Sequence, residues 1–124
     1  MVIPMGIRDV FKKGIMEMLV LVLLSESDLY GNQFPQLISK YSNGVIVIPE
    51  GSLYPLLYRL VDEGYVSCTR VPSGKRRILV YYHLEPSGAE RLHEMVSEYR
   101  IFADSVQSFL SSCNFSVEEG QDHD

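Results

Sequence analysis

The spacing of apolar residues changes twice along the chain, and these changes limit the folds that are open to it. Between residues 11 and 63 apolar side chains recur at intervals of three and four, which is typical of helices. From residue 65 to 84 the period becomes two, as in strands, and after residue 87 the helical spacing returns. The order predicts an α+β fold that is mostly α.

Three helices are predicted before the alternating segment. The first begins at Phe11, and its second half is apolar on nearly every side, so it should be buried on every side. The second runs near Tyr30–Tyr41. The third begins between residues 49 and 52, since Pro55 is tolerated only near a helix start, and it ends at Glu63. Its apolar stripe should be core and consists of Leu53, Leu56, Leu57 and Leu60.

The alternating segment predicts two strands joined by a turn at Pro72–Lys75. After it, Ser87 and Glu90 have the spacing of a capping box, with Ser87 as the cap of a new helix. Apolar residues then fall at intervals of 4, 3, 4, 3 and 4 from Leu92 to Leu110. This pattern predicts a long helix that packs against another helix along one seam.

The predicted order is that of a winged helix-turn-helix with a long C-terminal dimerisation helix. We expect an arm over residues 1–10, the winged helix over 11–86, the dimerisation helix over 87–115 and an acidic, disordered tail over 116–124. The apolar seam of the last helix would be about 27 Å long, more than a small domain can cover. A second subunit is therefore favoured over a helix folded back on its own domain.

The charge of the chain is unevenly distributed. Its net charge is −5, yet residues 1–84 carry 9 Lys and Arg against 7 Asp and Glu, whereas residues 85–124 carry 2 against 9. Local clusters decide what a surface attracts. The densest basic cluster, Lys75-Arg76-Arg77, lies in the predicted turn of the hairpin.

Four stretches of the chain form motifs on the predicted elements. They are Leu29-Tyr30-Gly31, Glu50 to Leu60 with Leu53-Tyr54-Pro55-Leu56-Leu57 at its centre, Glu63-Gly64-Tyr65-Val66, and Tyr81 to Gly88. Together they resemble the PadR family of bacterial transcriptional regulators, from about residue 14 to about residue 99. With a single C-terminal helix, the chain is similar to the family's short subfamily. The family often has an acidic residue at position 61, where this chain has Val61, and a basic residue at position 58, where it has Tyr58. The resemblance therefore does not give the base preference of this chain.

The resemblance implies a sequence-specific transcriptional regulator, by the family's habit a repressor, that binds a near-palindromic operator in double-stranded DNA as a homodimer. Opposite the leucine stripe, the third helix would present Ser52, Pro55, Tyr58, Arg59 and Asp62, with Tyr54 on the shoulder. Arg59 can fork onto a guanine, and Ser52 suits a phosphate. Lys75, Arg76 and Arg77 would contact phosphates or the minor groove. The resemblance implies that Tyr30 and Gln33 touch the DNA backbone.

Other interpretations of these residues stay open. Tyr30 and Tyr54 could pack the helices against the wing, and Arg59 could be an ordinary solvated charge. The surplus apolar surface expected between two subunits comprises Met16, Leu19, Leu23, Val96, Tyr99, Phe102 and Val106. The resemblance also implies release of the DNA when a small aromatic or drug-like effector enters the dimer interface. Met16, Tyr99 and Phe102 could line such a site, although ordinary interface packing is the simpler interpretation.

Several function classes find no support in the sequence. His83, His93 and His123 have no spacing with Asp, Cys or Ser that suggests a triad or a metal site, so we expect no enzyme, metal or cofactor. No export signal or membrane span is visible, and two widely separated cysteines fit the cytoplasm. The rivals are a winged helix that binds only protein, and a dimer that sequesters a small molecule.

Overall fold

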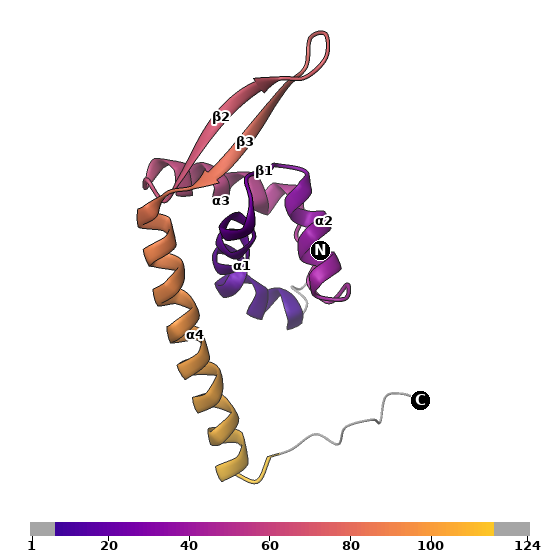
Figure 1. The fold of residues 1–124 in the computed structure, drawn as a ribbon. Coiled ribbons are helices and arrows are strands. Elements are labelled where there is room, and N and C mark those ends of the chain that lie inside the picture. The colour runs from indigo at the N-terminus through magenta and orange to yellow at the C-terminus, as the bar shows by residue number, and fades with distance from the viewer. Residues whose placement is uncertain (1–6, 116–124) are drawn as a thin grey trace. The chain divides into compact units, whose positions relative to one another are not determined.

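The computed structural model describes residues 7–115. Its elements in chain order are α1 (Ile7–Glu26), β1 (Leu29–Tyr30), α2 (Gln33–Tyr41), α3 (Glu50–Asp62), β2 (Val66–Pro72), β3 (Ile78–Leu84) and α4 (Pro86–Ser112) (Figure 1). The chain divides into two compact units, residues 1–93 and 94–124, and α4 begins in the first and continues into the second. The first unit is a winged helix-turn-helix, which confirms the predicted fold class.

The sheet has three antiparallel strands in the order β1-β3-β2. The long hairpin pairs Val66 with Leu84 at its base and Pro72 with Ile78 near its tip, and Figure 1 shows it projecting past the helices of its unit. Leu29 and Tyr30 form a short strand against Tyr82 and Tyr81. The prediction that the second helix starts near Tyr30 was therefore wrong, because these residues complete the sheet before α2 begins.

The core of the first unit lies where α1, α2 and α3 meet the sheet. Leu53, Leu57 and Leu60 of α3 are fully buried, which confirms most of the predicted stripe, while Leu56 is half-buried. On α1 the buried residues are Met18, Val20, Leu21, Leu23 and Leu24. The chain itself therefore buries most of the apolar half of α1.

Two helix boundaries differ from the expected ones. Helix α1 begins at Ile7, so the last residues of the expected arm are helical. Helix α4 begins at Pro86, whose fixed φ suits the first helical position, so Ser87 lies inside the first turn. The Ser87 hydroxyl donates to the carbonyl of Gly64 at 2.8 Å and is no cap. The expected tail from residue 116 lies outside the described residues.

The second unit continues α4 as a helix with several apolar side chains in solvent. The exposed ones are Tyr99, Ile101, Phe102, Val106, Phe109 and Leu110. Within residues 7–115, none of the helices combines the length and apolar character that a bilayer crossing requires.

Candidate nucleic-acid interface

One face of α3 is turned to solvent. The residues predicted opposite the leucine stripe are all exposed: Ser52, Pro55, Tyr58, Arg59 and Asp62. Pro55 is the sixth residue of the helix, in its second turn, where a proline removes a backbone hydrogen bond. Because α3 begins at Glu50, its predicted start between residues 49 and 52 is confirmed.

Tyr54 and Tyr58 lie one turn apart on α3, near the strands of the wing. Their ring centroids are 6.2 Å apart, with planes tilted by 36°. The half-buried Tyr54 ring lies so close to Gly31 that a Cβ there would be 2.7 Å from Tyr54 Cε1. The Tyr54 ring therefore packs within the chain, in line with one of the two interpretations of this residue. Tyr58 is 59% exposed and offers most of its ring to solvent.

A groove of about 280 Å³ separates α3 from the wing. Its lining residues come from β1, the start of α2, α3 and β3, and are Tyr30, Gly31, Asn32, Tyr54, Tyr58, Ile78, Leu79, Val80 and Tyr82. The four tyrosines give it aromatic walls with hydroxyl groups. Burial raises the pKa of Tyr82, so its phenol stays protonated over the physiological range.

Tyr30 and Gln33 are held by contacts within the chain. The Tyr30 ring packs edge-on against Tyr81 at a centroid distance of 5.4 Å. The Tyr30 backbone N–H donates to Oε1 of Gln33 at 3.0 Å, which ties β1 to the first turn of α2. The Tyr30 side chain thus packs within the chain, and the side-chain oxygen of Gln33 already accepts a hydrogen bond.

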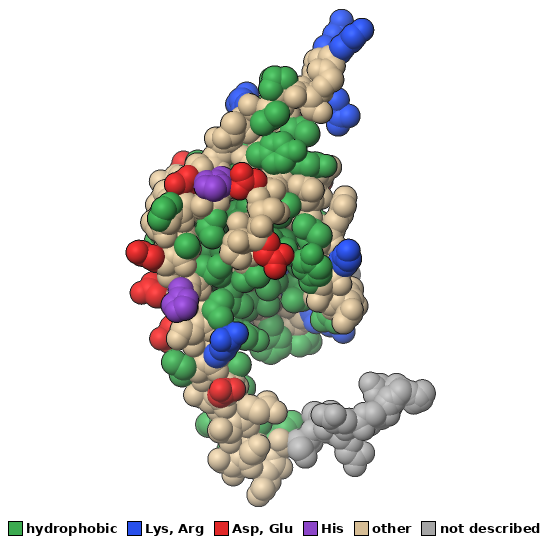
Figure 2. Space-filling model, viewed as in Figure 1, with side chains coloured by type: hydrophobic (Ala, Val, Ile, Leu, Met, Phe, Trp, Pro, Cys, Tyr) green, Lys and Arg blue, Asp and Glu red, His purple; other side chains and the backbone are tan. Residues whose placement is uncertain are grey.

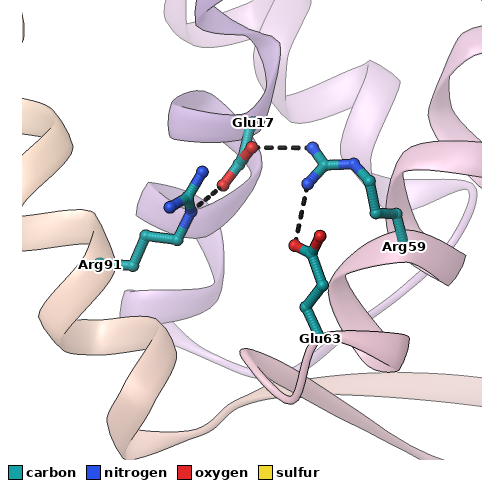
Figure 3. A network of polar contacts seen from close by, with 4 residues as sticks. All are labelled: Glu17, Arg59, Glu63 and Arg91. Carbon is teal, nitrogen blue, oxygen red and sulfur yellow. Dashed lines mark hydrogen bonds and ion pairs between the residues drawn. The ribbon is translucent and has the colours of Figure 1, made fainter.

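Arg59 lies on the other flank of α3 and forms part of an ion-pair network (Figure 3). Its Nη2 lies 2.8 Å from Oε1 of Glu17 on α1, and its Nη1 lies 3.0 Å from Oε1 of Glu63. The second oxygen of Glu17 accepts from Nε of Arg91 on α4. One carboxylate thus joins α1 to both α3 and the first part of α4.

The electrostatics of this network favour the charged forms of Glu17, Arg59 and Arg91. Burial raises the pKa of the Glu17 carboxyl, but hydrogen bonds from Arg91 and Arg59 outweigh it and leave the pKa below its ordinary value. The same hydrogen bonds raise the pKa of both guanidinium groups. The Glu17 side chain is only 12% exposed, so withdrawing Arg59 would leave a poorly solvated carboxylate with one partner fewer.

Sequence reasoning placed Arg59 on the outer face of α3 but missed its partners. Glu17 is 42 residues from Arg59, and Glu17 and Arg91 are 74 residues apart. No local spacing links residues at such distances. The fold brings them together by placing α1 beside α3 and the first part of α4, so no pattern in the sequence could have identified the network.

The tip of the hairpin carries the basic cluster. Lys75, Arg76 and Arg77 are exposed in the turn between β2 and β3, and Figure 2 shows Lys and Arg side chains gathered there. The turn is closed by a hydrogen bond from Ser73 N to Arg77 O at 2.8 Å. Gly74 has a φ of 72° and Arg76 a φ of 74°, so the turn uses left-handed backbone at two positions.

At the base of the wing, His83 on β3 pairs with Asp28, just before β1. Nδ1 of His83 lies 2.7 Å from Oδ1 of Asp28, and both side chains are more than half exposed. The hydrogen bond to Asp28 raises the pKa of His83. No spacing in the sequence pointed to this ion pair, because 55 residues separate His83 from Asp28.

The residues expected between two subunits differ in the surface that they offer. Leu23 is only 6% exposed and belongs to the chain's own core, so it has little surface left for a partner. Met16, Leu19 and Val96 are half-buried. Tyr99, Phe102 and Val106 are exposed by 48%, 71% and 46%. Among the residues predicted for the subunit interface, the most exposed ones thus lie in the second unit.

Comparison with known proteins agrees with this architecture. The model of the transcriptional regulator PadR-like family matches residues 20–94. An uncharacterized protein of Lysinibacillus sphaericus is 30% identical over 108 residues, which are 84% of this chain and 95% of that protein.

Solved structures share the fold. A transcriptional regulator from Clostridium thermocellum, 25% identical, superposes with a TM-score of 0.75 over 81% of this chain and 97% of the other. Bacillus subtilis PadR in complex with operator DNA, 23% identical, has a TM-score of 0.62. That similarity covers 66% of this chain and 46% of the other, and at this identity it shows the fold alone.

Proposed function

Since the chain belongs to the PadR-like family of transcriptional regulators, we propose that it binds double-stranded DNA through α3 and the β2–β3 hairpin and represses transcription. The observation that carries this proposal is the exposed face of α3 beside a hairpin whose tip is cationic. The major groove of DNA admits one helix, and cations on a neighbouring element can bind the phosphates. In this arrangement α3 presents four side chains to the major groove of the DNA, those of Ser52, Tyr54, Pro55 and Tyr58. The wing binds the phosphate backbone of the DNA through Lys75, Arg76 and Arg77.

The similarity to a PadR solved with operator DNA supports this use of the fold. The charge distribution supports it too, because the first 84 residues are positive overall while the whole chain is negative. Acidic residues concentrated after residue 84 raise the solubility of the protein without neutralising the wing.

We also propose that the protein binds a near-palindromic operator as a homodimer, since one recognition helix reads too few base pairs to select a site. The apolar side chains exposed in the second unit support this, because a row of such residues on a helix normally packs against another helix. Light scattering of the purified protein tests the dimer. Glutamate at Phe102 and Val106 should yield monomers, whereas glutamine at the exposed Ser105 should not.

The effector hypothesis concerns the same apolar surface. A small aromatic molecule that binds beside Tyr99 and Phe102 would lower the affinity for DNA if it favours a different arrangement of the subunits. If these residues only pack subunits together, no aromatic compound changes DNA affinity at concentrations that leave the dimer intact.

Selection of bound sequences from random double-stranded DNA tests the proposal directly. We expect a two-fold-symmetric consensus, bound far more tightly than random DNA at the same salt concentration. A reporter gene behind that consensus should be expressed less when the protein is present. Recovery of unrelated sequences only would reject DNA regulation and favour a protein-binding winged helix.

A further inference from the structure

The composition of α3 limits how this helix can read bases, an inference that rests on the proposed DNA binding. Guanine is usually read by Arg or Lys and adenine by Asn or Gln. Helix α3 (Glu50–Asp62) has no Lys, Asn or Gln, and its single cation is Arg59. Arg59 is therefore the one residue of α3 that belongs to the types that usually bind purine bases.

That side chain is already bound within the chain. Arg59 donates to Glu17 through one terminal nitrogen and to Glu63 through the other, the two nitrogens that would fork onto a guanine. A base contact would have to break both ion pairs and leave Glu17, which is 12% exposed, with Arg91 alone. Figure 3 shows the guanidinium directed at the two carboxylates, which lie on α1 and at the end of α3.

The exposed face of α3 retains an apolar centre. Pro55 and Tyr58 are three residues apart, so they lie one turn from each other on the same face, and both are exposed. Pro55 weakens its helix yet contributes nothing to the buried core. A proline at this position is explained if its apolar ring contacts a binding partner of the protein.

In the major groove, the apolar feature of a base pair is the 5-methyl group of thymine. We propose that α3 reads its operator mainly through thymine methyl groups in contact with Pro55 and the Tyr58 ring, and that Arg59 positions the helix without reading a base. The hydroxyl groups of Ser52 and Tyr54 then bind phosphates or the edges of either base pair.

Base analogues in the selected operator separate these modes of reading. Deoxyuridine in place of a thymidine removes only the methyl group, and each contacted methyl should be worth about fourfold in affinity. With Tyr58→Ser this sensitivity should vanish at one thymine of each half-site. With Tyr58→Phe, which keeps the ring, it should remain. Tyr58 is mostly exposed, so both variants should fold, and thermal unfolding verifies this.

A second analogue tests Arg59. Replacing guanosine by its 7-deaza analogue removes the N7 acceptor, and we expect an unchanged affinity at every guanine of the half-site. Insensitivity to deoxyuridine, or a tenfold loss with 7-deazaguanosine that disappears in Arg59→Met, would overturn the inference while DNA binding itself stands. A selection without any consensus would instead overturn the proposed function, and this inference with it.

Discussion

Nη2 of Arg59 and Oε1 of Glu17 lie 2.8 Å apart, although 42 residues separate them in the chain. Through this pair and the contact of Glu17 with Arg91, one carboxylate on α1 sets the position of α3 and of the first part of α4. The charge that sequence reasoning assigned to a base edge therefore has a structural partner on the neighbouring helix.

Replacing Glu17 by glutamine should lower the free energy of unfolding by about 1–2 kcal/mol at neutral pH, because two guanidinium groups lose their charged partner. The loss is modest because the arginines are 45% and 36% exposed and water screens the ion pairs. Urea denaturation measures the change. The same substitution at the exposed Glu90 is the control and should have an effect close to zero.

The effect of Glu17 should depend on pH with a definite sign. Its folded-state pKa is lowered, so its contribution is present above the unfolded pKa of about 4.3 and is lost as pH falls through the folded value. The difference between wild type and Glu17→Gln should therefore shrink under acid conditions. A difference that grows on acidification would contradict the assignment.

The close approach of Tyr54 to Gly31 predicts a coupled pair of substitutions. In Gly31→Ala the new methyl would lie 2.7 Å from Cε1 and 2.9 Å from Cζ of Tyr54, so the ring must move. We expect a loss of about 1–3 kcal/mol in unfolding free energy. In a Tyr54→Ser background most of that loss should disappear, which a double-mutant cycle would reveal as coupling. Additive effects would show that the two residues are not in contact.

The joint between the wing and α4 depends on Gly88. A Cβ at this buried glycine would lie 2.7 Å from Leu84 Cδ1 and would overlap the carbonyl oxygen of Tyr65. Since a backbone atom cannot yield as a flexible side chain does, Gly88→Ala should cost about 3 kcal/mol of stability. Gly14→Ala in α1 is the matched control. Nothing lies within 4 Å of its added Cβ, and it should stabilise the protein by about 0.5–1 kcal/mol.

The pair of His83 with Asp28 makes the base of the wing sensitive to pH. The hydrogen bond to Asp28 raises the pKa of His83, so its stabilisation is complete below the unfolded pKa of about 6.5. It is lost as pH rises through the folded value. The urea midpoint of wild type should exceed that of His83→Gln at about pH 6 and converge with it by about pH 8.5. Asp28→Asn should reproduce the same trend, and a gap that widens with pH would contradict it.

The order of elements could be predicted because hydrophobic period depends on local sequence alone. The stripe of Leu53, Leu57 and Leu60 reports one helix facing one core, and the period of two over residues 78–84 predicted the strand that pairs with β2. The strand formed by Leu29 and Tyr30 could not be predicted, since two residues carry no period. Its existence depends on pairing with Tyr82 and Tyr81, some fifty residues later.

For the candidate interface, too, local features could be predicted from the sequence and tertiary contacts could not. The exposed side chains of α3 and the basic turn follow from local pattern, whereas the orientation of Arg59 depends on α1. Ser87 is a similar case. Its spacing to Glu90 fits a capping box, yet the hydroxyl reaches Gly64, which the fold places beside it. Sequence pattern predicted which residues are polar and outward, and tertiary packing decided their partners.

If α3 and the wing bind DNA, the affinity must fall as salt rises, because the cations of the wing replace counterions on the phosphates. Fluorescence anisotropy against the selected operator, between about 50 and 200 mM salt, would compare wild type with Lys75→Ala/Arg76→Ala/Arg77→Ala. Arg59 stays unchanged, because its loss would disturb Glu17 as well. We expect weaker binding and a plot of log affinity against log salt that is shallower by about 1–3. Lys40→Gln, in the last turn of α2, serves as a basic control. An unchanged affinity and slope in the wing variant would contradict DNA binding through the wing.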